Sequence, residues 1–250
     1  MKFLLVTYND IDGVGQTVVG LNAILNKLGH KSKTLLLHKS KSDDNVILIK
    51  RSFFFRVFFF VLEFFKKNSR VLFSFGNTTI NFSSIKNHID DADVIIIYTL
   101  HKFLSFKMLS KILDTNKIVY LRPLDMELAV GGCHVNFLDN GDECDKFMTG
   151  CNQCPQLNSL NIFNISNKIF IKKKELMEKY KPKILLENEY TKKIYNNSPI
   201  TKNANNEAIY LTVNKKRANF INKQDSREIL KIKNDDKVIL FGTFNLDAPH

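Results

Sequence analysis

The feature that most constrains the fold is an apolar segment that runs into a glycine turn and then into an amphipathic segment. Residues 2–8 read KFLLVTY, and the turn that follows contains Gly13 and Gly15. Beyond the turn, apolar residues recur at spacings of three and four up to Gly29, which predicts a helix that ends there. A second strand is predicted over 33–38. A strand, a helix and a strand in this order favour a parallel sheet with right-handed crossovers.

The same alternation returns along the rest of the chain. Further strands are predicted over 94–100, 117–123, 183–187, 207–213 and 237–243. Helices are predicted over 103–113, over about 166–180, from Tyr190 and over 225–232. Short apolar runs of Val and Ile are typical of strands that are covered on both faces. The expected fold class is therefore α/β, a Rossmann-like parallel sheet with helices on both faces, plus a cysteine-rich loop.

The charge of the chain limits its partners. There are 37 Lys and Arg against 25 Asp and Glu, a formal charge of +12, which favours anionic partners such as nucleic acid, a membrane surface or phosphorylated small molecules. Lys and Asn are abundant throughout, so a general bias of composition explains the excess equally well. No groove-reading or ribonucleoprotein motif is present, and we expect no specific nucleic-acid partner.

The longest apolar run, Phe53 to Phe65, is the segment of the chain that could contact a membrane. Arg56 and Glu63 interrupt it, and it is shorter than the roughly 20 residues that cross a bilayer. With its flanking cations it predicts either a helix on a membrane surface or a helix packed in the core. The N-terminus has no cleavage site of a signal peptide. We expect a cytoplasmic protein, with peripheral association to the inner face of the cytoplasmic membrane as the open alternative.

The cysteines are the sharpest chemical signal. All four lie in one short segment, at Cys133, Cys144, Cys151 and Cys154. A Cys-x-x-Cys pair with two more cysteines nearby is typical of a closed tetrahedral Zn²⁺ site, which would be structural and would fold a loop that has few apolar residues. Free thiols or transient disulfides are the alternative. His134 is a fifth candidate ligand, but its position next to Cys133 disfavours joint ligation.

Other candidate residues follow predicted strands. His101 and Asp125 come just after two of them, at the edge where α/β sheets place ligand-binding groups, and both side chains can orient a hydroxyl or move a proton. The alternative for His101 is a histidine on a surface loop. The alternatives for Asp125 are a helix cap or a partner for Arg122. Gly13 and Gly15 can bring backbone N–H groups to a phosphate, or can simply form a tight turn. The fingerprint of NAD binding is incomplete.

Taken together, these segments resemble the N-terminal half of a GT-B-fold glycosyltransferase of family 4, in the branch of colanic-acid and other surface-polysaccharide transferases. The most specific part reads LDMELAVGGCH over 124–134 and continues through Cys144 to GCNQCPQL over 150–157. It is similar to the family's HDMW...TGGCH...C...GCxxCPQL segment. The sequence departs from the family at Leu124, where the family has His, and at Glu127, where it has Trp.

The resemblance implies a retaining, metal-independent transfer of a sugar from a nucleotide-diphosphate sugar to a lipid-linked or polysaccharide acceptor. It implies an acceptor-side domain over 1–213, with a linker and the first strand of a donor domain over 214–250. The expected catalytic residues are Asp125 and His101, and the expected substrate-binding residues are Gly13, Gly15, Arg122, Gly131, Gly132 and His134. We expect that this chain is the front part of a longer one and has negligible transferase turnover alone. The alternative function is a non-catalytic, zinc-stabilised module that binds an anionic glycan or a membrane surface.

Overall fold

The computed structural model describes residues 1–54, 57, 60–61, 72–138, 141–157, 163–210 and 221–240. The chain divides into two compact units. The first comprises Met1–Ile209, and the second comprises Tyr210–Ala248.

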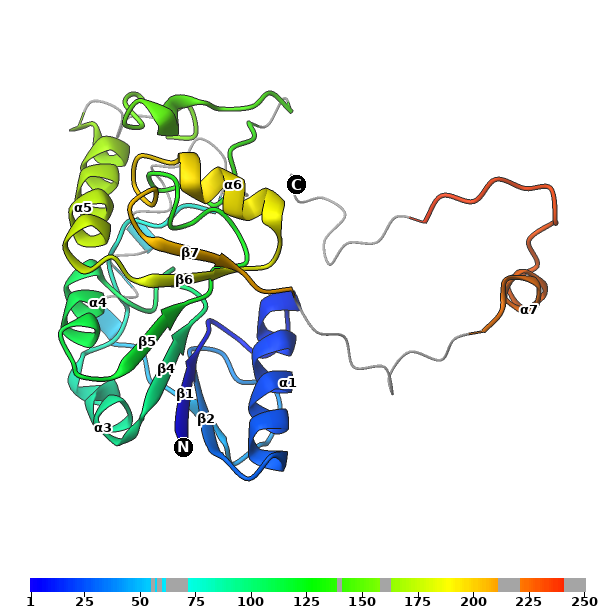
Figure 1. Ribbon diagram of the computed structural model, residues 1–250, viewed down its shortest axis with the longest axis horizontal. Helices are drawn as coiled ribbons and strands as arrows, with labels where there is room; N and C mark the ends of the chain where they lie inside the picture. The colour runs from blue at the N-terminus through cyan, green and yellow to red at the C-terminus, as the bar shows by residue number, and fades with distance from the viewer. Residues whose placement is uncertain are drawn as a thin grey trace. The chain divides into compact units, whose positions relative to one another are not determined.

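The first unit is built on a seven-stranded sheet in the order β3-β2-β1-β4-β5-β6-β7 (Figure 1). All neighbouring strands are parallel. The strands are β1 Lys2–Val6, β2 Lys31–Leu36, β3 Val46–Leu48, β4 Val94–Ile97, β5 Ile118–Leu121, β6 Lys183–Leu186 and β7 Asn205–Ala208. The order in the sheet reverses between β1 and β4, as in doubly wound α/β proteins. The prediction of a Rossmann-like parallel sheet is confirmed.

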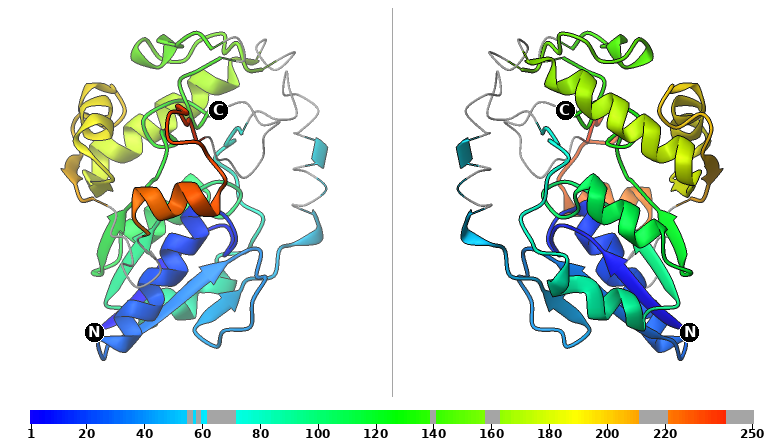
Figure 2. Two further views of the ribbon diagram at one scale, coloured as in Figure 1. Left: turned by 90° about the vertical axis from the view of Figure 1, so that its right-hand side faces the viewer. Right: turned by 90° about the vertical axis from the view of Figure 1, so that its left-hand side faces the viewer.

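Helices cover both faces of this sheet. They are α1 Gly13–Lys27, α3 Ser83–Asp91, α4 Phe106–Leu113, α5 Ile165–Tyr180 and α6 Glu189–Asn197, and a short 3-10 helix, η1, spans Lys146–Met148. Neighbouring residues of a strand point to opposite faces, so Leu5 packs in one cluster with Val18 of α1 while Leu4 packs in another with Ile85 of α3. Figures 1 and 2 show α1 on one face and α3, α4 and α5 on the other.

The start and the end of α1 are explained by its sequence. The Asp12 side chain caps the helix by accepting a hydrogen bond from the backbone N–H of Gly15 at 2.7 Å. A Cβ on Gly15 would lie 2.3 Å from the carbonyl oxygen of Asn9, so only glycine permits this close turn. At the other end, Gly29 has a φ of +84°, the left-handed conformation that ends helices. The predicted end at this glycine is confirmed.

Two elements are not predicted by the sequence pattern. The strand β3 has only three residues, and α3 has only two buried apolar residues, Ile85 and Ile89. Both signals are too short for the periodicity to be recognised. The other predicted strands and helices of the first unit are present, with ends that differ by a few residues. The strand predicted over 207–213 overlaps β7 only at 207–208, and residues 211–213 lie outside the described part.

In the second unit the helix α7 spans Lys223–Ile229, where a helix over 225–232 is predicted. The predicted strand over 237–243 is wrong for Lys237–Leu240, whose backbone is irregular, and residues 241–243 lie outside the described part. Ile239 is 94% exposed. An apolar run becomes a strand only where another strand pairs with it, and the described residues offer none to this segment.

The aromatic segment falls mostly outside the described residues. Those that are described, Phe53, Phe54, Val57, Phe60 and Val61, all have exposed side chains. The prediction of a membrane-surface helix therefore stays a prediction. Within the described ranges, no helix is long and apolar enough to cross a membrane.

Candidate functional site

Polar side chains gather at the carboxyl edge of the sheet. His101 follows β4, and Asp125 and Glu127 follow β5. The ring of Tyr8, which follows β1, has its centroid 6.0 Å from that of His101, and its hydroxyl lies 3.1 Å from Nε2 of His38. Open α/β sheets bind ligands at this edge, at the point where the strand order reverses.

Ser74 is the centre of this cluster. Its Oγ lies 2.7 Å from Oε1 of Glu127, 2.9 Å from Nδ1 of His101 and 2.8 Å from Nε2 of His134. All four side chains are buried. The other carboxylate oxygen of Glu127 accepts hydrogen bonds from the loop after β4, including one from the backbone N–H of Leu100 at 3.0 Å. The cluster therefore ties the loops after β4 and β5 to the segment that contains Ser74.

The protons of this cluster can be counted. Ser74 has one hydroxyl hydrogen, and it donates that hydrogen to Glu127. The rings of His101 and His134 must then supply the hydrogens of their own bonds to Ser74. Because Nδ1 of His134 also bonds to Oδ2 of Asp125, at 2.7 Å, both nitrogens of His134 carry a proton and its ring is a cation. His134 thus links the hydroxyl of Ser74 to the carboxylate of Asp125.

The pKa shifts of His134 and Asp125 agree with this assignment of protons. Burial lowers the pKa of His134, but the charges of Asp125 and Glu127 outweigh burial and raise it above its ordinary value. Burial likewise opposes ionisation of Asp125, but the charge and the hydrogen bond of His134 hold its pKa below the ordinary value. The side chain of Asp125 is 36% exposed and that of His134 only 5%. Asp125 is therefore an ionised carboxylate that faces solvent at the end of a buried network.

A buried lysine holds the loop that carries this network. Nζ of Lys173, on α5, donates to the carbonyl oxygens of Glu127, of Val130 at 3.0 Å and of Gly131 at 2.7 Å. Burial lowers the pKa of Lys173, and the carboxylate of Glu127 opposes this. Three acceptors require three N–H hydrogens, so Lys173 is an ammonium. Two cations, on His134 and Lys173, balance the carboxylates of Asp125 and Glu127.

The glycine pair 131–132 lets this loop pack closely. A Cβ on Gly132 would lie 2.0 Å from the ring of Phe73, and one on Gly131 would lie 2.9 Å from Sγ of Cys151. The backbone N–H of Gly131 also donates to that sulfur at 3.3 Å. The pair thus joins the Ser74 cluster on one side to the cysteine loop on the other.

The four cysteines lie around one small pocket. Cys133, Cys144, Cys151 and Cys154 all line it, and none of them forms a disulfide. Burial, with the nearby thiols, raises the pKa of Cys133, and burial raises that of Cys151 to about 11. Without a metal the thiols of Cys133 and Cys151 stay protonated, whereas a bound Zn²⁺ would deprotonate them. The donor set suits a zinc ion, but among the described residues no three of these sulfur atoms lie within 4.8 Å of one another, so the side chains would have to move closer together to bind it.

A second group can also bind a cation. Asp125, Glu127 and His134 each offer one ligand atom, and these atoms lie within 4.8 Å of one another. The ligand atoms are already engaged in the hydrogen bonds described above. A divalent cation would have to displace the proton of His134 and replace it as the counter-charge of the carboxylates. The existing charge balance makes such an ion unnecessary for folding.

The structure brings some of the candidate residues together and leaves others apart. Asp125, His101 and His134 belong to the Ser74 cluster. Arg122 instead donates to the carbonyl oxygen of Ile209 at 3.3 Å, beside the end of β7. The N–H of Gly15 is used by the cap of α1, and around Gly13 there is open space for a Cβ.

Sequence reasoning missed Ser74, Glu127 and Lys173 as members of the site. Ser74 stands between two phenylalanines, Phe73 and Phe75, an alternation that indicates a side chain on the opposite face from its neighbours. Glu127 departs from the pattern of the resembled family. Lys173 has no local signal, because it stands in a run of three lysines.

Comparisons with known proteins add little to this geometry. No family model matches the chain, and no curated protein matches it in sequence. Among solved structures, it is similar to a short chain dehydrogenase family protein from Francisella tularensis subsp. tularensis SCHU S4. The identity is 13%, the TM-score is 0.33, and the match covers 74% of this chain and 67% of the other. The assignment of the chain to the Rossmann-like α/β class stands on its own strand order.

Proposed function

We propose that this chain is the acceptor-side part of a GT-B-fold sugar transferase that uses a nucleotide-diphosphate sugar to build a bacterial surface polysaccharide. The proposal rests on one observation: the segment that resembles family 4 enzymes, residues 124–134, contributes Asp125, Glu127 and His134 to a single network at the ligand-binding edge of the sheet. In this proposal Asp125 is the group that meets the acceptor.

The chemistry of Asp125 suits a sugar hydroxyl. A carboxylate accepts a hydrogen bond from a hydroxyl group and takes up its proton as the oxygen attacks. His134 keeps Asp125 ionised and fixes its orientation through Nδ1, and Ser74 fixes the other nitrogen of the ring. The network therefore holds the partly exposed carboxylate of Asp125 in a fixed orientation.

Replacing Asp125 by asparagine is expected to weaken glycan binding by about tenfold, because a charge-assisted hydrogen bond to the acceptor is lost. Binding is measured on an array of neutral and acidic oligosaccharides. Asp44→Asn, at an exposed position, makes the same change of charge and is expected to bind like the wild-type protein. Thermal melting identifies variants that fail to fold.

Two outcomes would contradict the acceptor-side proposal. One is the absence of any glycan binding by the wild-type chain. The other is binding that Asp125→Asn leaves unchanged. Binding restricted to acidic glycans and insensitive to Asp125 would instead support the non-catalytic module with an anionic ligand.

We also propose that the cysteine pocket holds one structural Zn²⁺, with Cys133, Cys144, Cys151 and Cys154 as its ligands. The support is that all four side chains line the same pocket. The N–H of Gly131 stabilises the thiolate of Cys151, and the N–H of Gln156 lowers the pKa of Cys154 against the effect of burial. Such donors are typical of the outer shell of a metal site.

Elemental analysis of the reduced, purified protein is expected to find one zinc per chain. Chelation is expected to speed hydrogen exchange of the backbone amides over 131–157, because the metal orders a loop with few apolar residues. Cys151→Ser should lose the metal, whereas Ser166→Ala should keep it. A metal-free protein whose stability and exchange do not respond to a chelator would exclude the zinc site.

A further inference from the structure

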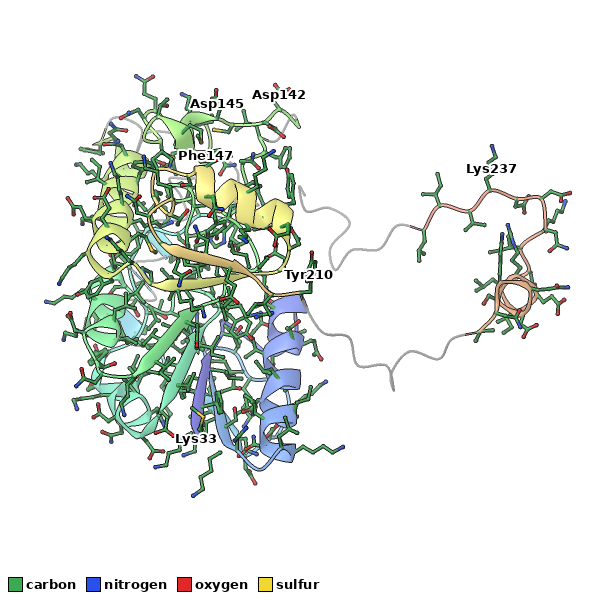
Figure 3. The ribbon with its side chains drawn as sticks, viewed as in Figure 1. Lys33, Asp142, Asp145, Phe147, Tyr210 and Lys237 are labelled. Atoms are coloured by element: carbon green, nitrogen blue, oxygen red, sulfur yellow. The ribbon has the colours of Figure 1, made fainter. Side chains whose placement is uncertain are left out.

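A second concave site lies at the amino edge of the sheet, away from the Ser74 cluster. It is a cavity of about 310 Å³ between the first residues of β1 and β2 and the last turn of α3. Figure 3 shows Lys33 at this end of the first unit and Asp142 and Asp145 at the other. Small-molecule sites start at about 300 Å³, so the cavity has room for a small ligand.

Positive charge converges on this cavity. Lys2, Lys31 and Lys33 line it together with one acidic residue, Asp91. Lys31 and Lys33 alternate along β2 and therefore point to the same face. Nζ of Lys2 lies 2.5 Å from Oδ1 of Asp91. In the part of the chain that the structure describes, no carboxylate forms a salt bridge with Lys31 or Lys33.

The charges of the lining do not cancel. Three ammonium groups face one carboxylate, which leaves a net charge of +2 among the residues that line the cavity. The hydrogen bond of Lys2 holds the pKa of Asp91 below its ordinary value, and the charges of Lys2, Lys33 and Lys31 add to this effect. All three lysines are therefore close enough to Asp91 to stabilise its charged form. Asp93 lies nearby and accepts a hydrogen bond from the backbone N–H of Lys2 at 2.7 Å.

The remaining walls supply a hydrogen-bonding ring and an apolar surface. Burial and the charge of Lys33 lower the pKa of His88, so its ring is neutral at pH 7 and one of its nitrogens can donate a hydrogen bond. Phe3 and Leu4 of β1 form part of the apolar wall. A ligand with a charged head and a less polar body matches this lining.

We propose that this cavity binds a small molecule that carries a phosphate group in its dianionic form. Lysine ammonium groups bind phosphate as point charges and need no fixed geometry. The net charge of the lining matches that of a phosphate monoester dianion. Lys31 and Lys33 contact the phosphate oxygens directly, His88 donates to a third oxygen, and Lys2 is shared between the ligand and Asp91. This site is independent of the proposed acceptor side.

Titration of the full chain with inorganic pyrophosphate and with ribose 5-phosphate tests the proposal. Calorimetry at fixed ionic strength is expected to give dissociation constants in the millimolar range or below, and NMR is expected to show shifts at the amides of 2–4, 31–33 and 88–92. The double variant Lys31→Gln/Lys33→Gln is expected to weaken binding by about tenfold or more. Lys107→Gln/Lys172→Gln removes the same charge from exposed positions elsewhere and should bind like the wild-type protein.

For a third variant we expect phosphate binding to become tighter instead of weaker. Asp91→Asn removes the carboxylate that competes for Lys2 and is expected to tighten phosphate binding severalfold. Equal weakening in both double variants would mean that only the overall charge attracts the anion, and would overturn the proposal. So would the absence of amide shifts around the cavity at millimolar ligand, or equally strong binding of sulfate.

Discussion

Replacing Lys173 by methionine is expected to lower the free energy of unfolding by about 3–5 kcal/mol, the usual cost of removing one partner from a buried charged network. Methionine has a similar length, so the change removes the ammonium without opening a large cavity. The carbonyl oxygens of Glu127, Val130 and Gly131 lose their donor inside the protein. The buried carboxylate of Glu127 also loses one of its two counter-charges.

Urea unfolding followed by circular dichroism measures this loss. The adjacent Lys172 is exposed, and Lys172→Met is expected to change the free energy of unfolding by less than about 0.5 kcal/mol. Equal effects of the two substitutions would contradict the inward orientation of Lys173 and its role as the donor of the loop 127–131.

Gly132→Ala is expected to cost about 3 kcal/mol, at the upper end of the usual range for overpacking. The new Cβ would lie 2.0 Å from Cζ of Phe73, a ring with no exposed surface. The backbone cannot easily yield, since the carbonyl oxygen of Gly132 accepts a hydrogen bond from the N–H of Ser74 at 2.6 Å. A shift of this segment would therefore also disturb the Ser74 cluster.

The matched control is Gly20→Ala in the middle of α1, where a Cβ meets nothing within 4 Å. This substitution is expected to stabilise the protein by about 0.5–1 kcal/mol, because alanine favours the helix. Adding Phe73→Leu to Gly132→Ala should recover part of the loss, since the two residues share the same space. Unchanged stability of Gly132→Ala would show that the loop and Phe73 do not pack as described.

The sheet and its helices are largely readable from the sequence because their signals are local. In β1, the adjacent apolar residues Leu4 and Leu5 indicate a strand that is buried on both faces, and they pack in different clusters. Gly29 marks the end of α1 because only the left-handed conformation closes the helix there. The error at 237–240 has the same origin: an apolar run indicates a strand but does not supply the strand that pairs with it.

The candidate site could be predicted only in part. His101 and Asp125 follow buried strands, and parallel strands bring their ends to one edge, so their positions follow from the fold class. The sequence does not predict that Asp125 pairs with His134. Arg122 also follows β5, yet its guanidinium donates to the carbonyl oxygen of Ile209 and not to the cluster.

The sequence by itself determined the strand and helix alternation, the tight turn at Gly15 and the composition of the cysteine loop, since each depends on neighbours within a few residues. Only the tertiary structure decided that Ser74 meets Glu127 and His134, from which it is separated by 53 and 60 residues. It also decided which lysine of the run 172–174 is buried. Because successive residues of a helix point in different directions, only Lys173 of the three points into the core. There it donates hydrogen bonds to carbonyl oxygens of the loop 127–131.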